Sequence, residues 1–137
     1  MTNFLDFKTL TRPASPNTYL VAPEGFFDQA NPDDTSPAFE KSARGLFSTL
    51  AEIIAQERRW QEVLSDPDQL KFRFVAKTPL MGFKDDVDIM IIVPEADAGS
   101  TGNATTLAIY SRSRVGYSDM GANRKRVNKL LQALTTK

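Results

Sequence analysis

The residues best suited to chemistry lie in one stretch near the C-terminus, at 111–126. Arg112, Arg114 and Arg126 could hold a phosphate or a carboxylate through paired guanidinium hydrogen bonds. A helix that begins near Ser118 would add backbone N–H groups and the positive end of its dipole. The candidate ligand-binding residues are therefore Arg112, Arg114, Ser118, Asp119, Asn123 and Arg126.

The same residues also have a purely structural interpretation. Arginines on one strand can pair with carboxylates on its neighbour and form a ladder of ion pairs across the sheet. Ser118 or Asp119 would then serve as the N-cap of the helix. Asp119 also argues against a bound anion, because its carboxylate would occupy the same N–H donors.

Three aspartates form a second candidate group, at Asp85, Asp86 and Asp88. Strand alternation places Asp85 on the opposite face from the other two, so we predict no metal site. An enzyme could use Asp85 or Asp86 as a base, with arginines orienting an anionic substrate. Such a base needs a carboxylate pKa raised by burial. No phosphate-binding loop or nucleophile elbow accompanies these acids, so we predict no catalytic residue and no cofactor.

Composition narrows the chemistry further. The chain has 137 residues, no cysteine and no histidine. Disulfides, thiolate nucleophiles, histidine bases and His- or Cys-ligated metals are therefore excluded. Apolar residues make up 41% and charged residues 25%, as in ordinary globular domains. We predict a single α+β domain at 36–137, with an irregular N-terminal segment, residues 1–35, packed against it.

Charges are balanced in number but not in position. There are 17 basic and 17 acidic residues, yet Asp119 is the only acid after residue 108, against seven basic residues. The zero net charge and the lack of a binding motif argue against a nucleic-acid partner. The sequence has no run of apolar residues long enough for a membrane span and no secretory signal, so it predicts a cytoplasmic location.

Hydrophobic periodicity predicts the elements that must position these residues. Apolar residues recur at helical spacing over 37–57, after Ser36 as N-cap, and again over 119–135. Alternating apolar and polar residues predict strands near 60–64, 70–77, 87–93 and 105–113. Short connections favour antiparallel pairing, with both helices on one face. The expected fold is an α+β two-layer sandwich of about four strands and two helices.

The alternation also assigns side chains to faces. If Phe72, Ile89 and Ile109 face the helices, then Asp86, Arg112 and Arg114 point away from them. Ser111 and Ser113 fall on the helix side. Asn123 and Arg126, one and two turns into the second helix, can reach back toward the turn that precedes it. This turn contains Gly116 and Gly121, which suit tight backbone geometry. The predicted supporting residues are Asp85, Asp86, Ser111, Ser113, Gly116 and Gly121.

The stretch at 111–126 resembles the signature of a family called domain of unknown function 1499. That signature reads S-x-S-R-x-G-x-S-D-x-G-x-N-x-x-R, and every fixed position is met here. The segment Met81-Gly-Phe-Lys-Asp-Asp-Val87 is similar to the family's G-F-x-D-x-[VI] pattern, and 17–23 resembles its N-terminal stretch. The resemblance extends over nearly the whole chain from about Pro13.

The resemblance implies no activity, since the family has none assigned. It implies association with the cell envelope for many members, which carry a membrane helix or export signal. This sequence lacks both, and it lacks the cysteine that many members have near the N-terminal motif. We favour a non-enzymatic binding domain that recognises an anionic small molecule, a lipid headgroup or a partner's carboxylate at the 111–126 turn. The alternatives are the Asp85/Asp86 enzyme and a purely structural motif.

Overall fold

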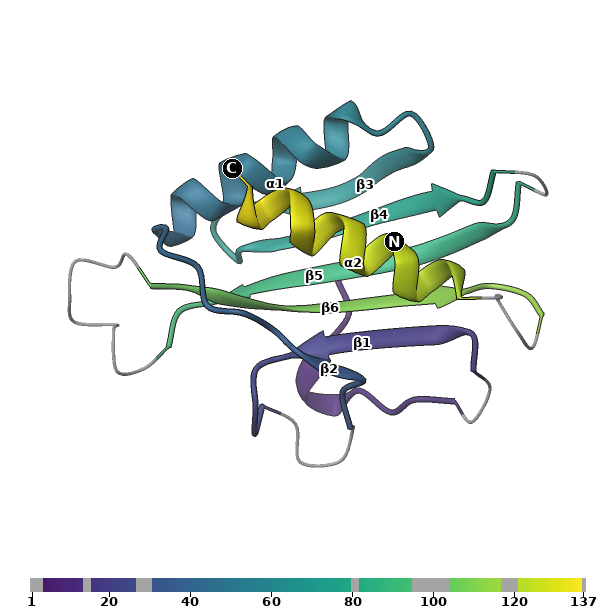
Figure 1. Cartoon of the computed structure of the whole chain (residues 1–137), viewed down its shortest axis with the longest axis horizontal. Helices are drawn as coiled ribbons and strands as arrows, with labels where there is room; N and C mark the ends of the chain where they lie inside the picture. The colour runs from purple at the N-terminus through teal and green to yellow at the C-terminus, as the bar shows by residue number, and fades with distance from the viewer. Residues whose placement is uncertain are drawn as a thin grey trace.

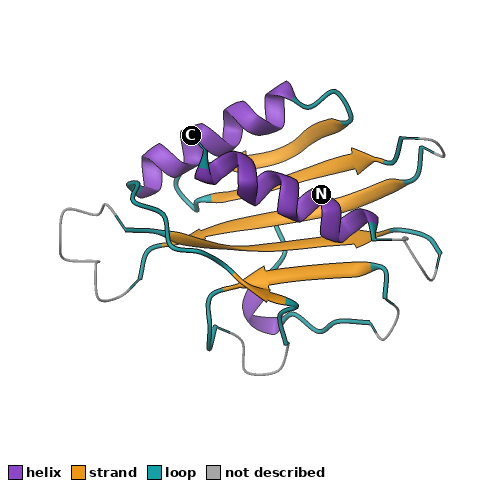
Figure 2. Cartoon of the chain, viewed as in Figure 1, coloured by secondary structure: helices purple, strands orange, loops and turns teal. Residues whose placement is uncertain are grey.

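A single twisted sheet with two helices on one face makes up the fold (Figures 1 and 2). The computed structural model describes residues 4–13, 16–26, 31–79, 82–94, 104–116 and 121–136. Its elements are η1 (Phe7–Thr9), β1 (Thr18–Ala22), β2 (Asp34–Thr35), α1 (Ala43–Gln56), β3 (Trp60–Asp66), β4 (Lys71–Lys77), β5 (Lys84–Ile92), β6 (Thr106–Ser113) and α2 (Ala122–Thr135). The strand order is β2-β1-β6-β5-β4-β3, and only β1 and β2 pair in parallel. The predicted α+β class is confirmed.

The main core lies between the helices and the sheet. Apolar positions of α1 and α2 pack on Phe72, Phe74, Ile89 and Ile109, all of them almost fully buried. Trp60 stacks on Phe74 with 4.8 Å between ring centroids. These residues occupy alternate strand positions, as predicted, so their charged neighbours point to the other face.

The other face is not wholly open. The N-terminal segment packs Phe7 and Leu10 against Leu20, Ala108 and Tyr110 and forms a second, smaller cluster. This cluster lies over β1 and β6. The charged residues Asp86, Arg112 and Arg114 lie toward one end of the same face. The face away from the helices is therefore covered in part by the N-terminal segment.

The sheet has six strands rather than the four that periodicity predicts. The additional strands are β1 and β2, which come from the stretch predicted to be irregular. β1 pairs with β6 from Thr18↔Arg112 to Val21↔Ile109 and therefore lies inside the sheet. The prolines near β1 lie outside Thr18–Ala22. They interrupt the alternation of apolar and polar residues but do not prevent β1 from pairing with β6.

Helix α1 begins at Ala43, not at residue 37. Ser42 is the N-cap, and its hydroxyl accepts the Gly45 N–H at 3.0 Å. The residues before it stay extended because Phe39 pairs with Thr105 through two backbone hydrogen bonds. Ser36, the predicted cap, is buried beside Thr106 instead. Tertiary pairing thus overrides a good local helix start.

Helix α2 begins at Ala122, three residues after the predicted start. Gly121 is its N-cap, with φ +81° and no side-chain cap. The predicted caps, Ser118 and Asp119, lie outside the described residues. The other boundaries differ from prediction by no more than two residues, apart from the start of β5, which lies three residues earlier, at Lys84.

Candidate anion-binding site

A buried polar network joins the end of β6 to the start of α2 on the helix side of the sheet. Ser111 donates to Asn123 Oδ1 at 2.6 Å, and Asn123 Nδ2 donates to Ser113 Oγ at 3.0 Å. Asn123 Nδ2 also reaches the Asn17 carbonyl oxygen at 3.0 Å, just before β1. Arg126 donates to Ser111 Oγ at 3.1 Å and to Asn123 Oδ1 at 2.8 Å. Four residues of the signature, Ser111, Ser113, Asn123 and Arg126, therefore connect β6, α2 and the backbone just before β1.

A buried ion pair extends this network to β5. Arg126 lies 2.8 Å from Asp85 Oδ2, and their side chains are 9% and 1% exposed. A carboxylate so far from water is stable as an anion only beside a cation or strong donors. Arg126 thus connects α2 to β5 of the sheet through a buried ion pair.

The opposite face carries a separate set of ion pairs. Arg114 forms two hydrogen bonds to Asp86, at 2.9 and 3.0 Å, and Arg73 lies 3.9 Å from the same carboxylate. Arg112 lies 2.9 Å from Asp88 Oδ2. These are the cross-strand pairs that alternation predicts, set by the registers Asp86↔Arg112 and Asp88↔Tyr110.

The predicted ligand-binding residues therefore do not converge on one point. Arg126 and Asn123 lie on the helix side, while Arg112 and Arg114 lie on the other face, with the sheet between them. All three arginines contact a carboxylate. Arg112, Arg114 and Arg126 are therefore not placed to hold one anion together.

The turn between β6 and α2 is described only at its two ends. Gly116 has φ +86° and Gly121 has φ +81°, a region that side chains with a Cβ rarely adopt. Asn17 Nδ2 donates to the Gly116 carbonyl oxygen at 2.7 Å and anchors the first end. Among the described residues, no atom lies within 4 Å of a Cβ added at either position, so backbone geometry is the reason for glycine that the described residues show.

Asp86 is held in its ionised form. Burial raises its pKa, but hydrogen bonds and charge from Arg114, with smaller effects of Arg112 and Arg73, bring the pKa below the usual range of aspartate. A depressed pKa is the opposite of what a carboxylate base requires. The Asp86 half of the enzyme hypothesis therefore has no support from its surroundings.

The lowered pKa of Asp86 predicts that the stability of the fold decreases at low pH. Because the folded-state pKa lies below the unfolded value, the contribution of Asp86 is present above about pH 4 and is lost as the pH falls through the folded pKa. Arg114 is 47% exposed, so water limits that contribution to about 1 kcal/mol or less. Chemical denaturation should show a steeper loss of stability below pH 4 in the wild type than in Asp86→Asn. Parallel curves for the two proteins would contradict this assignment.

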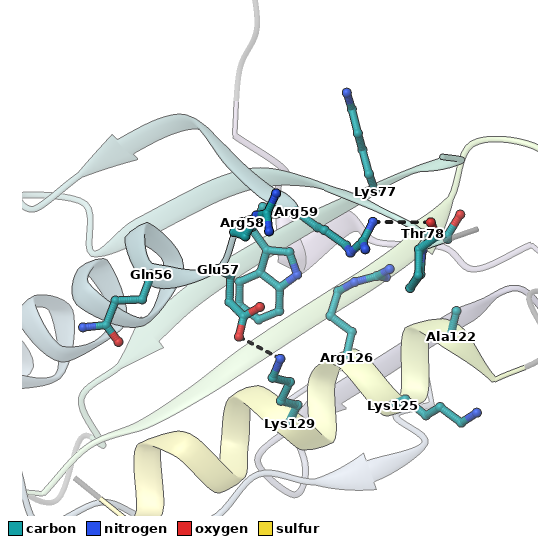
Figure 3. A pocket seen from close by; sticks show the side chains of 12 residues that line it. Gln56, Glu57, Arg58, Arg59, Lys77, Thr78, Ala122, Lys125, Arg126 and Lys129 are labelled. Atoms are coloured by element: carbon teal, nitrogen blue, oxygen red, sulfur yellow. Dashed lines mark hydrogen bonds and ion pairs between the residues drawn. The ribbon is translucent and has the colours of Figure 1, made fainter. Parts of the chain in front are cut away.

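A strongly basic pocket lies beside the buried network, between the C-terminal end of α1 and α2 (Figure 3). Its volume is about 620 Å³. Arg59 and Arg126 point toward the same part of the pocket, and Lys77 and Lys125 extend outward at its rim (Figure 3). The lining residues are Gln56, Glu57, Arg58, Arg59, Trp60, Lys77, Thr78, Pro79, Ala122, Lys125, Arg126 and Lys129.

Few acids balance this pocket. Glu57 pairs with Lys129 at 2.7 Å, and Asp85 pairs with Arg126 beneath it. Within the described ranges, no salt bridge involves Arg58, Lys77 or Lys125. Two pairs of like charges are also direct neighbours. Lys77 of β4 lies opposite Lys84 of the adjacent strand β5, and Lys125 and Lys129 are one turn apart on α2.

Sequence reasoning missed this pocket, apart from Arg126. Its residues come from three distant stretches, at 56–60, 77–79 and 122–129, which no local pattern connects. Two signals pointed toward it. Arg58 and Arg59 directly precede the one tryptophan, and the C-terminal segment is basic. Only the tertiary fold, in which β3 is the edge strand and β4 lies beside it, brings them together.

The described residues contain no group of three or more acidic side chains placed to hold a metal ion. No helix among them is both long enough and apolar enough to cross a membrane.

Comparisons with known proteins agree with the signature at 111–126. Residues 9–134 match the model of a family described as protein of unknown function (DUF1499). The match extends from before β1 almost to the end of α2 and so includes the whole sheet. A search of curated proteins finds no match.

Proposed function

The chain belongs to the DUF1499 family, whose description assigns no activity, and from the geometry of its residues we propose that it binds an anionic small molecule in the basic pocket. The ligand would carry phosphate or carboxylate groups. The observation that supports this most directly is the gathering of six basic side chains from three segments around one pocket. They are Arg58, Arg59, Lys77, Lys125, Arg126 and Lys129.

The arrangement of these charges favours a ligand over a merely solvated surface. Like charges on opposed strand positions and one helical turn apart lower stability. An anion between them would relieve that repulsion. In addition, the first turn of α2 has no acidic residue that would offset the positive end of its dipole. A basic cluster with few acidic partners is typical of sites where stability is reduced for binding.

The size and lining of the pocket suit a small molecule. Pockets for such ligands measure about 300–1,000 Å³ and combine an apolar wall with a few polar groups. Trp60 provides an aromatic wall, and Thr78 adds a hydroxyl group to the lining. Guanidinium groups can bind an oxyanion through two parallel hydrogen bonds, which gives orientation as well as attraction.

This proposal moves the ligand from the 111–126 turn to the neighbouring pocket, with Arg126 common to both. The signature residues then act as structural support, since Ser111, Asn123 and Arg126 hold α2 where it forms the pocket wall. The enzyme alternative is weaker. It needs a carboxylate with a raised pKa, whereas Asp86 has a lowered pKa and Asp85 pairs with Arg126.

Thermal unfolding with a panel of anions tests the proposal. The panel contains inorganic phosphate, pyrophosphate, glycerol phosphate and citrate, each compared with sodium chloride at equal ionic strength. A ligand at a hundred times its dissociation constant stabilises by about 2.7 kcal/mol, which raises Tm by several degrees. We expect at least one anion to do so in the wild type and in Arg44→Ala, where the lost charge lies at the far end of α1.

The double variant Arg58→Ala/Lys125→Ala should lose that increase, because it removes two charges from the pocket wall. Neither side chain takes part in the buried network, so the fold should be retained. The proposal is wrong if every anion acts only as sodium chloride does, or if the double variant responds as strongly as the wild type.

A further inference from the structure

Two large apolar side chains are exposed at the same end of the sheet as the basic pocket. Phe83 is 46% exposed and Val115 is 58% exposed. Phe83 directly precedes β5, and Val115 follows two residues after the end of β6. The two stretches lie side by side, because the Arg114 N–H donates to the Lys84 carbonyl oxygen at 3.3 Å. A single exposed apolar residue is ordinary, but a neighbouring pair among basic residues is not.

Hydrogen bonds fix the backbone that displays these side chains. Thr78 N donates to the Phe83 carbonyl oxygen at 2.9 Å, and Phe83 N donates to the Thr78 hydroxyl at 2.9 Å. On the other stretch, Asn17 Nδ2 donates to the Gly116 carbonyl oxygen at 2.7 Å. Phe83 and Val115 therefore occupy defined positions while their side chains meet water.

Basic side chains surround the pair. Lys84 and Arg114 are the direct chain neighbours of Phe83 and Val115, and Lys77 faces Lys84 across β4 and β5. Lys77 N donates to the Arg59 carbonyl oxygen at 2.9 Å, which brings the turn before β3 to the same end. A second hollow, lined by Arg58, Lys84 and Arg114 among others, adjoins the pocket here. We call this surface the basic end.

Charge is polarised along the strands. At the basic end, the acids of the described residues are Glu57, Asp85 and Asp86, each in an ion pair. The turn between β3 and β4, at the opposite end, carries Asp66 and Asp68, with Lys71 opposite Asp66. The protein has no net charge but has one positive end. An anionic surface would attract that end and so orient the whole protein.

We propose that the basic end docks on the surface of an anionic lipid bilayer. Phe83 and Val115 enter the interface between headgroups and acyl chains, and the pocket receives the phosphate of a headgroup. This inference rests on the proposed anion-binding function and names the source of the anion. Apolar side chains that project from a basic surface fit a membrane interface, where burial and attraction to anionic lipids act together. A partner that binds through charge alone would not account for the exposed apolar side chains of Phe83 and Val115.

Vesicle co-sedimentation tests this inference with the whole chain. We expect binding to vesicles of phosphatidylcholine with phosphatidylglycerol to exceed binding to pure phosphatidylcholine at least about ten-fold, because several basic residues contribute at once. The variant Phe83→Ser/Val115→Ser should lower that binding about ten-fold as well, since two apolar side chains lose their burial. Val63→Ser removes an equally exposed apolar residue from β3 and should bind as the wild type does.

A second readout separates this inference from the proposed function. Neither Phe83 nor Val115 lines the basic pocket, so their variant should keep the wild-type rise in Tm with pyrophosphate. If the wild type responds to pyrophosphate but not to anionic vesicles, membrane docking is wrong and the anion pocket stands. If the serine variant binds vesicles as tightly as the wild type, the apolar pair does not insert, and the inference is also overturned. If pyrophosphate and vesicles both leave the wild type unchanged, both proposals fail.

Discussion

Replacing Arg126 with alanine should lower the free energy of unfolding by about 3 to 5 kcal/mol, the usual cost of removing one partner of a buried ion pair. The change leaves the Asp85 carboxylate, 1% exposed, without the guanidinium 2.8 Å away. It also removes the donor to Ser111 and Asn123, which join α2 to β6. Urea denaturation of the two proteins at neutral pH measures the difference.

Two controls make this prediction specific. Lys129→Ala breaks the ion pair with Glu57 on the same helix, but Lys129 is 64% exposed, so the loss should stay below about 1 kcal/mol. In a double-mutant cycle, Asp85→Asn should reduce the cost of Arg126→Ala by at least about 1 kcal/mol, because the buried charge is then gone. Additive effects in the cycle, or a cost for Arg126→Ala as small as for Lys129→Ala, would show that the pair does not fix α2.

Reversing two charges in the pocket should reduce anion affinity about a hundred-fold or more, since each reversal replaces an attraction with a repulsion of similar size. The variant is Arg58→Glu/Lys125→Glu. These residues approach the pocket from the turn before β3 and from α2, and both line it. Titration calorimetry with the anion that stabilises the wild type most gives the two affinities.

The matched control is Arg44→Glu, which makes the same kind of change on α1, outside the pocket. It should leave the affinity within about two-fold, because a distant exposed charge is screened by salt. Equal losses in the control and the pocket variant would point to attraction by the whole protein rather than to a site.

Much of the fold follows from periodicity. Alternation along 70–77, 87–93 and 105–113 places Phe72, Ile89 and Ile109 under the helices, as observed. The same alternation separates Ser111 from Arg112, and the structure confirms that they lie on opposite faces. Asn123 and Arg126 reach back from α2 to Ser111 of β6, because α2 begins close to the end of that strand.

Other features depend on tertiary pairing and leave little trace in the local sequence. Ser36-Pro37 reads as a helix start, yet Phe39 pairs with Thr105 and delays the helix to Ala43. Thr18–Ala22 is short and lies among prolines, so its place inside the sheet depends on β6 as partner. Alternation predicts Arg112 and Arg114 on one face, but assigning Arg126 to the same anion neglects the sheet between them.

The pocket shows the limit of local reasoning most clearly. Arg59, Lys77 and Lys125 are far apart in sequence, and each resembles an ordinary solvated charge in its own stretch. Their proximity comes from the edge position of β3 and β4 and from the packing of α1 beside α2. The excess of basic residues after residue 108 indicates an anion partner, but not where it would bind.

The chain's one tryptophan provides the most direct test of the central claim, that the basic pocket binds an anion. Trp60 lines the pocket and stacks on Phe74, so its indole N–H resonance and its fluorescence report on binding in this part of the protein. The measurement is an NMR titration of the indole N–H with pyrophosphate at constant ionic strength. We predict a saturable shift of this resonance that is absent in Arg58→Glu/Lys125→Glu. An indole resonance that does not move, or that moves equally in both proteins, would contradict the account.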